Sequence, residues 1–336
     1  MKRARLLIGI PLLLLICVAS GLFIELQNYA DRPAEADSSN EVVINVPQGQ
    51  TLKTTADMLY QKSIIKSPLK MVWIARLKGY DKSLKAGEYV LSAGMSPRQI
   101  LEVMVKGEVK LHKLTVPEGL NTYQIADLVA QAGFAAKTDF ISAATDTALV
   151  RKMGLDAETF EGYLFPDTYY FPREVSVEKI ISTMVQRFQD IFVTDWRERA
   201  KQLEFTVNQV VTLASIIEKE TGAPSERALI SSVFHNRLKK KMRLESDPTV
   251  IYGIKDFNGN LTRRHLKTTT PYNTYQIRGL PAGPIANPGR ASLEAALYPE
   301  DTDYIYFVSK KDSTHQFSTN LKDHNRAVRK YQLGRN

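Results

Sequence analysis

The chain has 336 residues, a formal net charge of +9 and a hydrophobic content of 43%. This length suits two domains, and the hydrophobic content is sufficient for packed cores. The single cysteine, Cys17, excludes an internal disulfide. The five histidines are scattered without metal-ligand spacing, so we expect neither a metal site nor a cofactor. The positive charge suits anionic surroundings such as lipid headgroups, nucleic acid or an acidic polymer.

The N-terminus predicts a membrane anchor. An uncharged run, Leu6–Ile24, has 19 residues and would span about 28 Å as a helix, close to the hydrocarbon thickness. Cations precede it at Lys2, Arg3 and Arg5, and acids follow at Glu25 and Asp31. This order places the N-terminus in the cytoplasm and the remaining chain outside, which disfavours nucleic acid as a partner. A cleaved signal peptide is the alternative, with Val18-Ala19-Ser20 as a poor cleavage site.

Composition divides the chain into four segments. Residues 1–25 form the cytoplasmic N-terminus and anchor, and the small polar residues 26–41 predict a flexible tether. Residues 42–109 predict a small α+β module, with strands at 43–47 and 87–91 and helices at 51–62, 67–77 and 96–105. Residues 110–336 predict a larger mixed α+β domain, with helices at 122–132, 138–144, 177–190, 195–203, 206–221, 225–240 and 292–297 and a strand at 304–308. The predicted fold class is therefore α+β behind an N-terminal transmembrane helix.

One apolar helix carries an acid where packing alone would favour a hydrophobic residue. Thr206 and Gln209 fit a capping box at its start, and Gly222 fits a C-terminal stop. Glu218 falls inside the apolar arc of this helix, whereas Glu220 points about 200° away. A carboxyl group in apolar surroundings keeps its proton to a higher pH, as a general acid requires near neutrality. The alternative is an acid at the edge of a buried helix, paired to a Lys or Arg.

Several long motifs occur in one order along the chain. They are the segments 161–169 (EGYLFPDTY), 213–222 (LASIIEKETG), 234–238 (FHNRL), 246–249 (SDPT) and 279–289 (GLPAGPIANPG). Together with the anchor and the N-terminal module, they closely resemble the endolytic murein transglycosylases of the YceG-like family. The resemblance covers nearly the whole chain.

The resemblance implies a single-pass enzyme of the cell inner membrane that cleaves peptidoglycan glycan strands internally. It implies that residues 42–109 are LysM-like, that Glu218 is the catalytic acid, and that penicillin-binding synthases are partners in terminating nascent strands. In such a reaction one carboxyl protonates the glycosidic oxygen, and its carboxylate then accepts the proton of the muramic acid 6-hydroxyl. That hydroxyl attacks C1 and leaves a 1,6-anhydro end. One acid acts twice, so a second carboxylate at hydrolase spacing is not required.

Other polar residues of these motifs are candidate substrate ligands. Aromatic and amide side chains suited to a sugar groove are Tyr272, Asn273, Tyr275 and Gln276, and further candidates are Glu161, Tyr163, Glu220, Ser246 and Asp247. A rigid structural loop is the alternative for the first group, and Asp247 before Pro248 also fits a turn. Two other functions stay open: a hydrolytic muramidase, which needs a second catalytic carboxylate, and a non-catalytic membrane-tethered peptidoglycan-binding scaffold.

Overall fold

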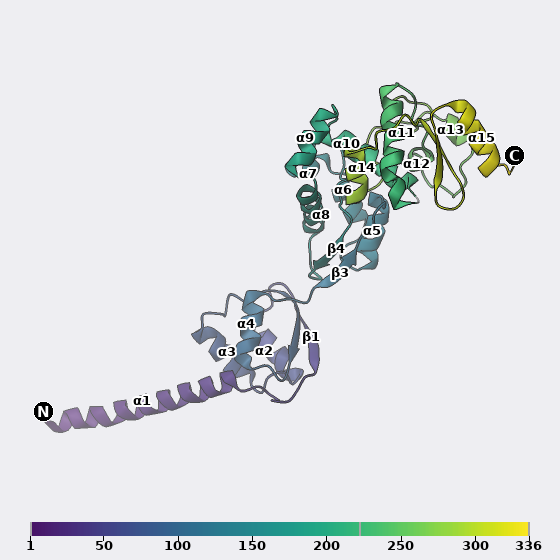
Figure 1. Cartoon of the computed structure of the whole chain (residues 1–336). Helices are drawn as coiled ribbons and strands as arrows, with labels where there is room; N and C mark the ends of the chain where they lie inside the picture. Colours follow the sequence, from purple (N-terminus) through teal and green to yellow (C-terminus); the bar gives the residue numbers. More distant parts are fainter. Residues whose placement is uncertain (1, 222, 335–336) are drawn as a thin grey trace. The chain divides into compact units, whose positions relative to one another are not determined.

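The computed structural model describes residues 2–221 and 223–334, and side chains from residue 13 onward (Figure 1). The chain forms two compact units. Unit 1 comprises Met1–His112 and Tyr170–Glu174, and unit 2 comprises Lys113–Tyr169 and Val175–Asn336. Both contain helices and strands, so the predicted mixed α+β class is confirmed.

Unit 1 packs helices against a two-stranded antiparallel sheet. Its elements are α1 (Lys2–Asp31), β1 (Glu41–Val46), α2 (Leu52–Gln61), α3 (Pro68–Leu77), β2 (Gly87–Ser92) and α4 (Pro97–Lys106). The register places Glu41 opposite Ser92 and Val46 opposite Gly87. Alternate residues of each strand are buried, as the two-residue period of a strand requires. The helix that begins after Ser96 carries the capping box with Gln99 that holds its first turn.

The first helix extends further than the sequence predicts. Residues Leu13–Asp31 are long and apolar enough to cross a membrane by length and composition. The helix continues six residues past the predicted anchor, to Asp31, because Tyr29 and Ala30 pack on the core of unit 1. The predicted tether therefore begins as helix, and only residues 32–40 of it lack both helix and strand.

Two short strands, β3 (His112–Thr115) and β4 (Thr168–Phe171), form a second sheet. The chain changes unit within β3 and again within β4. The motif at residues 161–169 thus runs into a strand.

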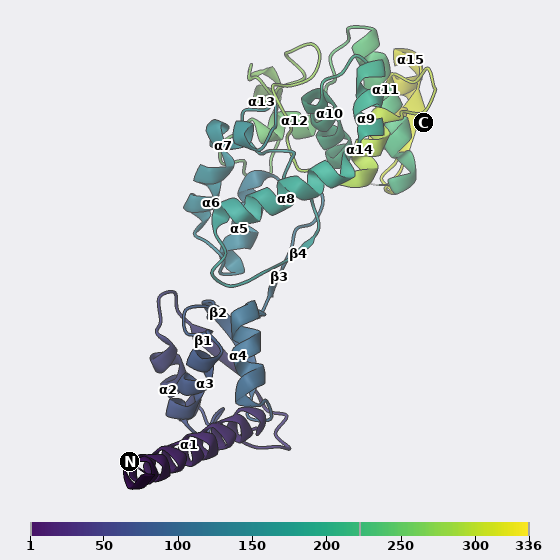
Figure 2. The same cartoon turned by 90° about the vertical axis from the view of Figure 1, so that its left-hand side faces the viewer.

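Unit 2 is mainly helical. Its helices are α5 (Thr122–Gln131), α6 (Lys137–Ala144), α7 (Thr147–Lys152), α8 (Val177–Ile191), α9 (Thr194–Gln202), α10 (Val207–Glu220), α11 (Arg227–Lys239), α12 (Asp247–Tyr252), α13 (Arg263–Lys267), α14 (Arg290–Leu297) and α15 (Leu321–Tyr331). An antiparallel hairpin of β5 (Tyr306–Ser309) and β6 (His315–Ser318) precedes α15. Figure 2 shows the same arrangement from a second direction.

Helix α10 lies at the centre of unit 2. Its predicted capping box is confirmed, because Thr206 Oγ1 accepts from Gln209 N and the Gln209 side chain accepts from Thr206 N. Residues Val210–Ile217 are all buried, and α10 packs against α14, α11 and α12. The helix ends at Glu220, and the predicted stop at Gly222 lies outside the described residues. Because Val210–Ile217 are packed in the core, the positions of Glu218 and Glu220 at the end of the helix are fixed.

Candidate functional site

The Glu218 carboxyl lies among polar groups at the end of α10. Its side chain is only 8% exposed, and Arg227 Nη2 lies 3.7 Å from Glu218 Oε1. Gly289 N, just before α14, donates to Glu218 Oε2 at 3.0 Å. The helix is apolar as predicted, but its acid faces a cation and a backbone donor. The ion-paired alternative therefore describes these contacts better than fully apolar surroundings.

A second carboxyl, Glu118, lies beside this site. A Cβ added to Gly289 would come within 1.8 Å of Glu118 Oε1, so Glu118 rests directly on the glycine that donates to Glu218. Burial raises the pKa of Glu118, the negative charge of Glu218 raises it further, and Arg227 opposes both effects. Three charged side chains from separate segments thus meet around one glycine.

The segment that carries Glu118 is held in place by the backbone. Gly119 N donates to the Asn287 carbonyl at 2.9 Å, and Lys219 Nζ donates to the Gly119 carbonyl at 3.1 Å. Asn287 N donates back to the Leu120 carbonyl at 2.8 Å. The predicted motif that ends in Gly289 therefore fixes Glu118 as well as Glu218.

Arg227 has an unused donor. Its Nε atom is buried and has no hydrogen-bond partner among the described residues. A buried donor without a partner costs free energy, which an incoming oxygen ligand would recover. Sequence analysis missed both Glu118 and Arg227, and the only local signal at Glu118 is its place between Pro117 and Gly119.

Glu220 faces a different environment. Ser246 Oγ donates to Glu220 Oε1 at 2.6 Å, and burial raises the pKa of Glu220. The Tyr275 hydroxyl donates to Asp247 Oδ1 at 2.8 Å, and burial raises the pKa of Tyr275. Glu220, Asp247 and Tyr275 help to line a cavity of about 490 Å³. The structure thus brings together four predicted substrate ligands, and the two glutamates of α10 point apart as predicted.

Glu161 is a buried carboxyl that joins three segments. It accepts from Thr122 N at 3.2 and 3.1 Å, from the Tyr252 hydroxyl at 3.0 Å and from Asn287 Nδ2 at 3.0 Å. Burial nevertheless raises its pKa to about 7, because desolvation outweighs these hydrogen bonds. Through Asn287, Glu161 is connected to the loop that contacts Glu218.

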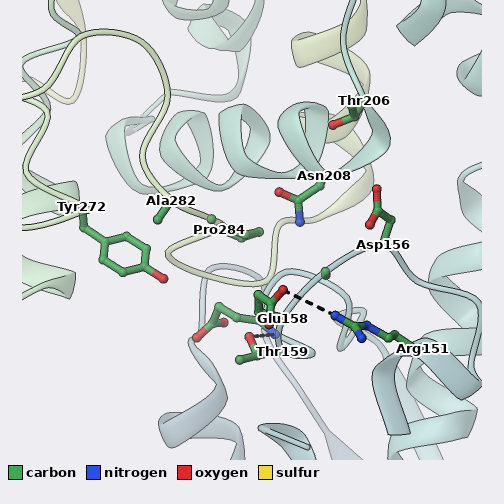
Figure 3. Close-up of a pocket in the computed structure, with 12 residues that line it drawn as sticks. Arg151, Asp156, Glu158, Thr159, Thr206, Asn208, Tyr272, Ala282 and Pro284 are labelled. Atoms are coloured by element: carbon green, nitrogen blue, oxygen red, sulfur yellow. Dashed lines mark hydrogen bonds and ion pairs between the residues drawn. The ribbon is translucent and has the colours of Figure 1, made fainter. Parts of the chain in front are cut away.

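Glu161 and Tyr272 line a second cavity, of about 310 Å³ (Figure 3). Figure 3 shows the Tyr272 ring reaching toward the cavity from one side and Asn208 from the helix above it. The Tyr272 ring also packs edge-on against Tyr252, with centroids 4.8 Å apart. Glu218 lies in the lining of neither cavity.

Three predicted substrate ligands occupy structural positions instead. Tyr163 is buried, its ring packs edge-on against Phe188, and burial raises its pKa to about 12. Asn273 is buried and its Nδ2 donates to the carbonyls of residues 265, 266 and 268. Gln276 Nε2 donates to the Leu266 carbonyl at 2.7 Å. The contacts of Asn273 and Gln276 agree with the structural-loop alternative, because their amide groups already donate hydrogen bonds to backbone carbonyls.

The YceG-like family matches residues 44–330. The chain belongs to this family. It is 35% identical to an endolytic murein transglycosylase of Bacillus subtilis, over 90% of this chain and 88% of the relative. It is 29% identical to an endolytic murein transglycosylase of Streptococcus pneumoniae, over 88% of this chain but only 59% of the relative. A crystal structure of a yceG-like protein from Listeria monocytogenes matches with a TM-score of 0.60 and 35% identity, covering 86% of this chain and 99% of that one.

Proposed function

We propose that this chain cleaves peptidoglycan glycan strands internally, between MurNAc and GlcNAc, and leaves 1,6-anhydro-MurNAc ends. It is a lytic transglycosylase by its relationship to the curated relatives, and murein is the substrate that their names give. The observation that carries the residue assignment is the position of Glu218, held at the end of a buried helix by Arg227 and Gly289 N.

In the proposed reaction Glu218 is the only proton carrier. Its carboxyl gives a proton to the glycosidic oxygen, and the bond from C1 of MurNAc to that oxygen breaks. Arg227 and Gly289 N then stabilise the carboxylate, because opposite charge and a donated hydrogen bond favour the ionised form. The carboxylate accepts the proton of the MurNAc 6-hydroxyl, whose oxygen bonds to C1. Proton count and charge return to the starting state, and no water is consumed.

A hydrolytic muramidase is the second candidate, and Glu118 is the observation that favours it. Hydrolysis uses a second carboxylate to activate water or to attack C1. Glu118 lies beside Glu218 on Gly289, so the site has a second carboxyl that the helix alone does not provide. The two candidates differ in their products by one molecule of water.

The finer parts of the proposal follow from the family resemblance and the N-terminal sequence. The chain would be anchored in the inner membrane through residues 6–24, with its N-terminus cytoplasmic and both units beyond the membrane outside. Residues 42–109 would act as a LysM-like glycan-binding module. Cleavage of nascent strands beside penicillin-binding synthases would terminate strand elongation. Six further side chains are proposed to help bind the substrate: Glu161, Glu220, Ser246, Asp247, Tyr272 and Tyr275.

Mass spectrometry of products from un-crosslinked glycan strands tests the function. With the full chain in detergent we expect anhydro-ended fragments, and Glu218→Gln should lower the rate by about 10²–10⁴ because the proton donor is lost. Glu198→Gln is the matched control, since it removes an exposed carboxyl that pairs with Lys201 on α9. Reducing ends would assign the muramidase reaction instead. Strand binding without cleavage would assign the scaffold.

A further inference from the structure

Helix α3 of unit 1 is apolar on two opposite faces. One face, formed by Met71, Val72, Ile74 and Ala75, is buried in the core of unit 1. On the other face Leu69 is 67% exposed, Trp73 51% and Leu77 58%. These three residues are four positions apart and therefore lie one above another on the helix. A helix that is apolar all round normally has an apolar medium on both sides.

The position of α3 is fixed relative to the end of α1. The Tyr29 hydroxyl donates to the Ser67 carbonyl at 2.9 Å and accepts from Ser67 N at 3.1 Å. Lys70 Nζ lies 2.6 Å from Glu25 Oε1. The contacts occur in opposite order along the two helices, so α3 runs back toward the apolar part of α1. Figures 1 and 2 both place α3 beside α1.

These contacts place α3 at the level where the apolar run of α1 ends. Glu25 is the first charged residue after that run, and Lys70 is paired to it. A cavity of about 370 Å³ at this junction is lined by Glu25, Arg32, Lys66 and Lys70 among others. Three cations, one acid and an exposed tryptophan form the composition expected where protein meets the headgroups of anionic lipids.

We propose that the face formed by Leu69, Trp73 and Leu77 lies in the outer headgroup layer of the membrane that α1 spans, with anionic headgroups beside Arg32, Lys66 and Lys70. The proposal rests on the membrane anchor proposed above. Unit 1 then lies on the bilayer through two elements, α1 and α3. Its height above the membrane is set by the fold and not by a flexible tether.

The chain has two tryptophans, Trp73 and Trp196, so one substitution makes Trp73 the only one. The full-length Trp196→Phe variant would be reconstituted into vesicles of phosphatidylcholine and phosphatidylglycerol, with and without brominated acyl chains. Bromine quenches tryptophan only at short range. We expect bromine to remove most of the Trp73 emission, and the vesicles to shield Trp73 from acrylamide.

A matched control carries its only tryptophan on β1, which Figure 1 shows on the far side of unit 1 from the free part of α1. The variant is Val43→Trp with Trp73→Phe and Trp196→Phe, because Val43 is also exposed, at 44%. Its emission should not respond to bromine. Co-flotation with the vesicles reports the anchor separately from the docking of α3.

Four outcomes are distinct. Bromine quenching of Trp73 but not of the β1 tryptophan supports the proposal. A protein that floats with the vesicles but whose Trp73 stays unquenched and open to acrylamide overturns it while the anchor stands. Shielding of Trp73 that depends on protein concentration and not on bromine assigns the face to a second copy of the chain. Failure to float overturns the anchor and the docking together, while cleavage of glycan strands still reports the enzymatic function.

Discussion

Glu118 and Arg227 act on the Glu218 carboxyl in opposite directions. Glu118 places a second carboxyl against Gly289, and Arg227 places a cation 3.7 Å from Glu218. Lys219, the other charged neighbour, is directed to the Gly119 carbonyl, and Glu226 is paired with His315. The charge around Gly289 is therefore that of two neighbouring carboxyls and one arginine.

Substitution of either neighbour should move the alkaline limb of the pH–rate profile. A negative neighbour disfavours loss of a proton and a positive one favours it. Glu118→Gln should therefore shift the limb to lower pH, and Arg227→Gln should shift it to higher pH. The measurement is the initial cleavage rate of glycan strands across pH for each variant. A lower rate at every pH with an unmoved limb would mean that Glu118 only maintains the local fold.

Glu161 predicts a pH dependence of stability. Its pKa is raised from 4.5 to about 7, so between these values the folded chain binds a proton that the unfolded chain has lost. Stability from this group is therefore full below about pH 4.5 and falls as pH rises to about 7, by about 3 kcal/mol.

Glu161→Gln should remove that fall. A glutamine oxygen can still accept from Thr122 and Asn287, and its amide can donate to the Tyr252 hydroxyl, which rotates to accept. Urea unfolding at about pH 5 and pH 8 measures the effect, followed by the fluorescence of Trp196 in a Trp73→Phe background where it is the single tryptophan. An unchanged pH dependence in the variant would show that another group is responsible.

At the scale of elements, side-chain caps marked the starts of some helices, but the short helices α7 and α13 were missed although Asp146 and Thr262 cap them. Ser96 and Thr206 carry complete capping boxes, and both helix starts were predicted from the sequence. The helix α12 was missed because Asp247-Pro248 also fits a turn, and α15 because Ala327 is its only buried residue among those described. Hairpin β5–β6 was predicted only as a single strand.

The site was less predictable than the helices. Periodicity correctly separated Glu218 from Glu220, because both lie on one helix. Glu118 approaches Glu218 through its contact with Gly289, and these three residues lie in separate segments that no local sequence pattern connects. Asn273 and Gln276 have the residue types of sugar ligands, but their amides are used by carbonyls that only the folded loop brings near.

The capping box of α10 supports the element that carries Glu218. Thr206→Ala removes the acceptor of Gln209 N and should cost about 1 kcal/mol. Thr206→Ser keeps a hydroxyl at the cap and should recover most of this loss. Urea unfolding of the two variants measures the difference. Equal stability of the Ala and Ser variants would mean that packing of α10 holds its first turn without the cap.

At the scale of the whole molecule, the two units each have their own core. Unit 1 buries residues such as Ile44 and Leu91 within itself, and unit 2 is built around α10 and α14. Separate cores allow separate unfolding, so a single two-state transition is not expected. We predict two thermal transitions for the full chain in detergent, measured by scanning calorimetry.

A pair of matched core substitutions assigns these transitions. Leu91 in unit 1 and Leu293 in unit 2 are both fully buried. Each leucine-to-alanine change should cost about 2–5 kcal/mol through lost burial and the cavity left behind. Leu91→Ala should therefore lower the Tm of one transition, and Leu293→Ala should lower that of the other. A single peak that both variants shift equally would mean that the units unfold together, because contacts between them would then contribute as much stability as the separate cores.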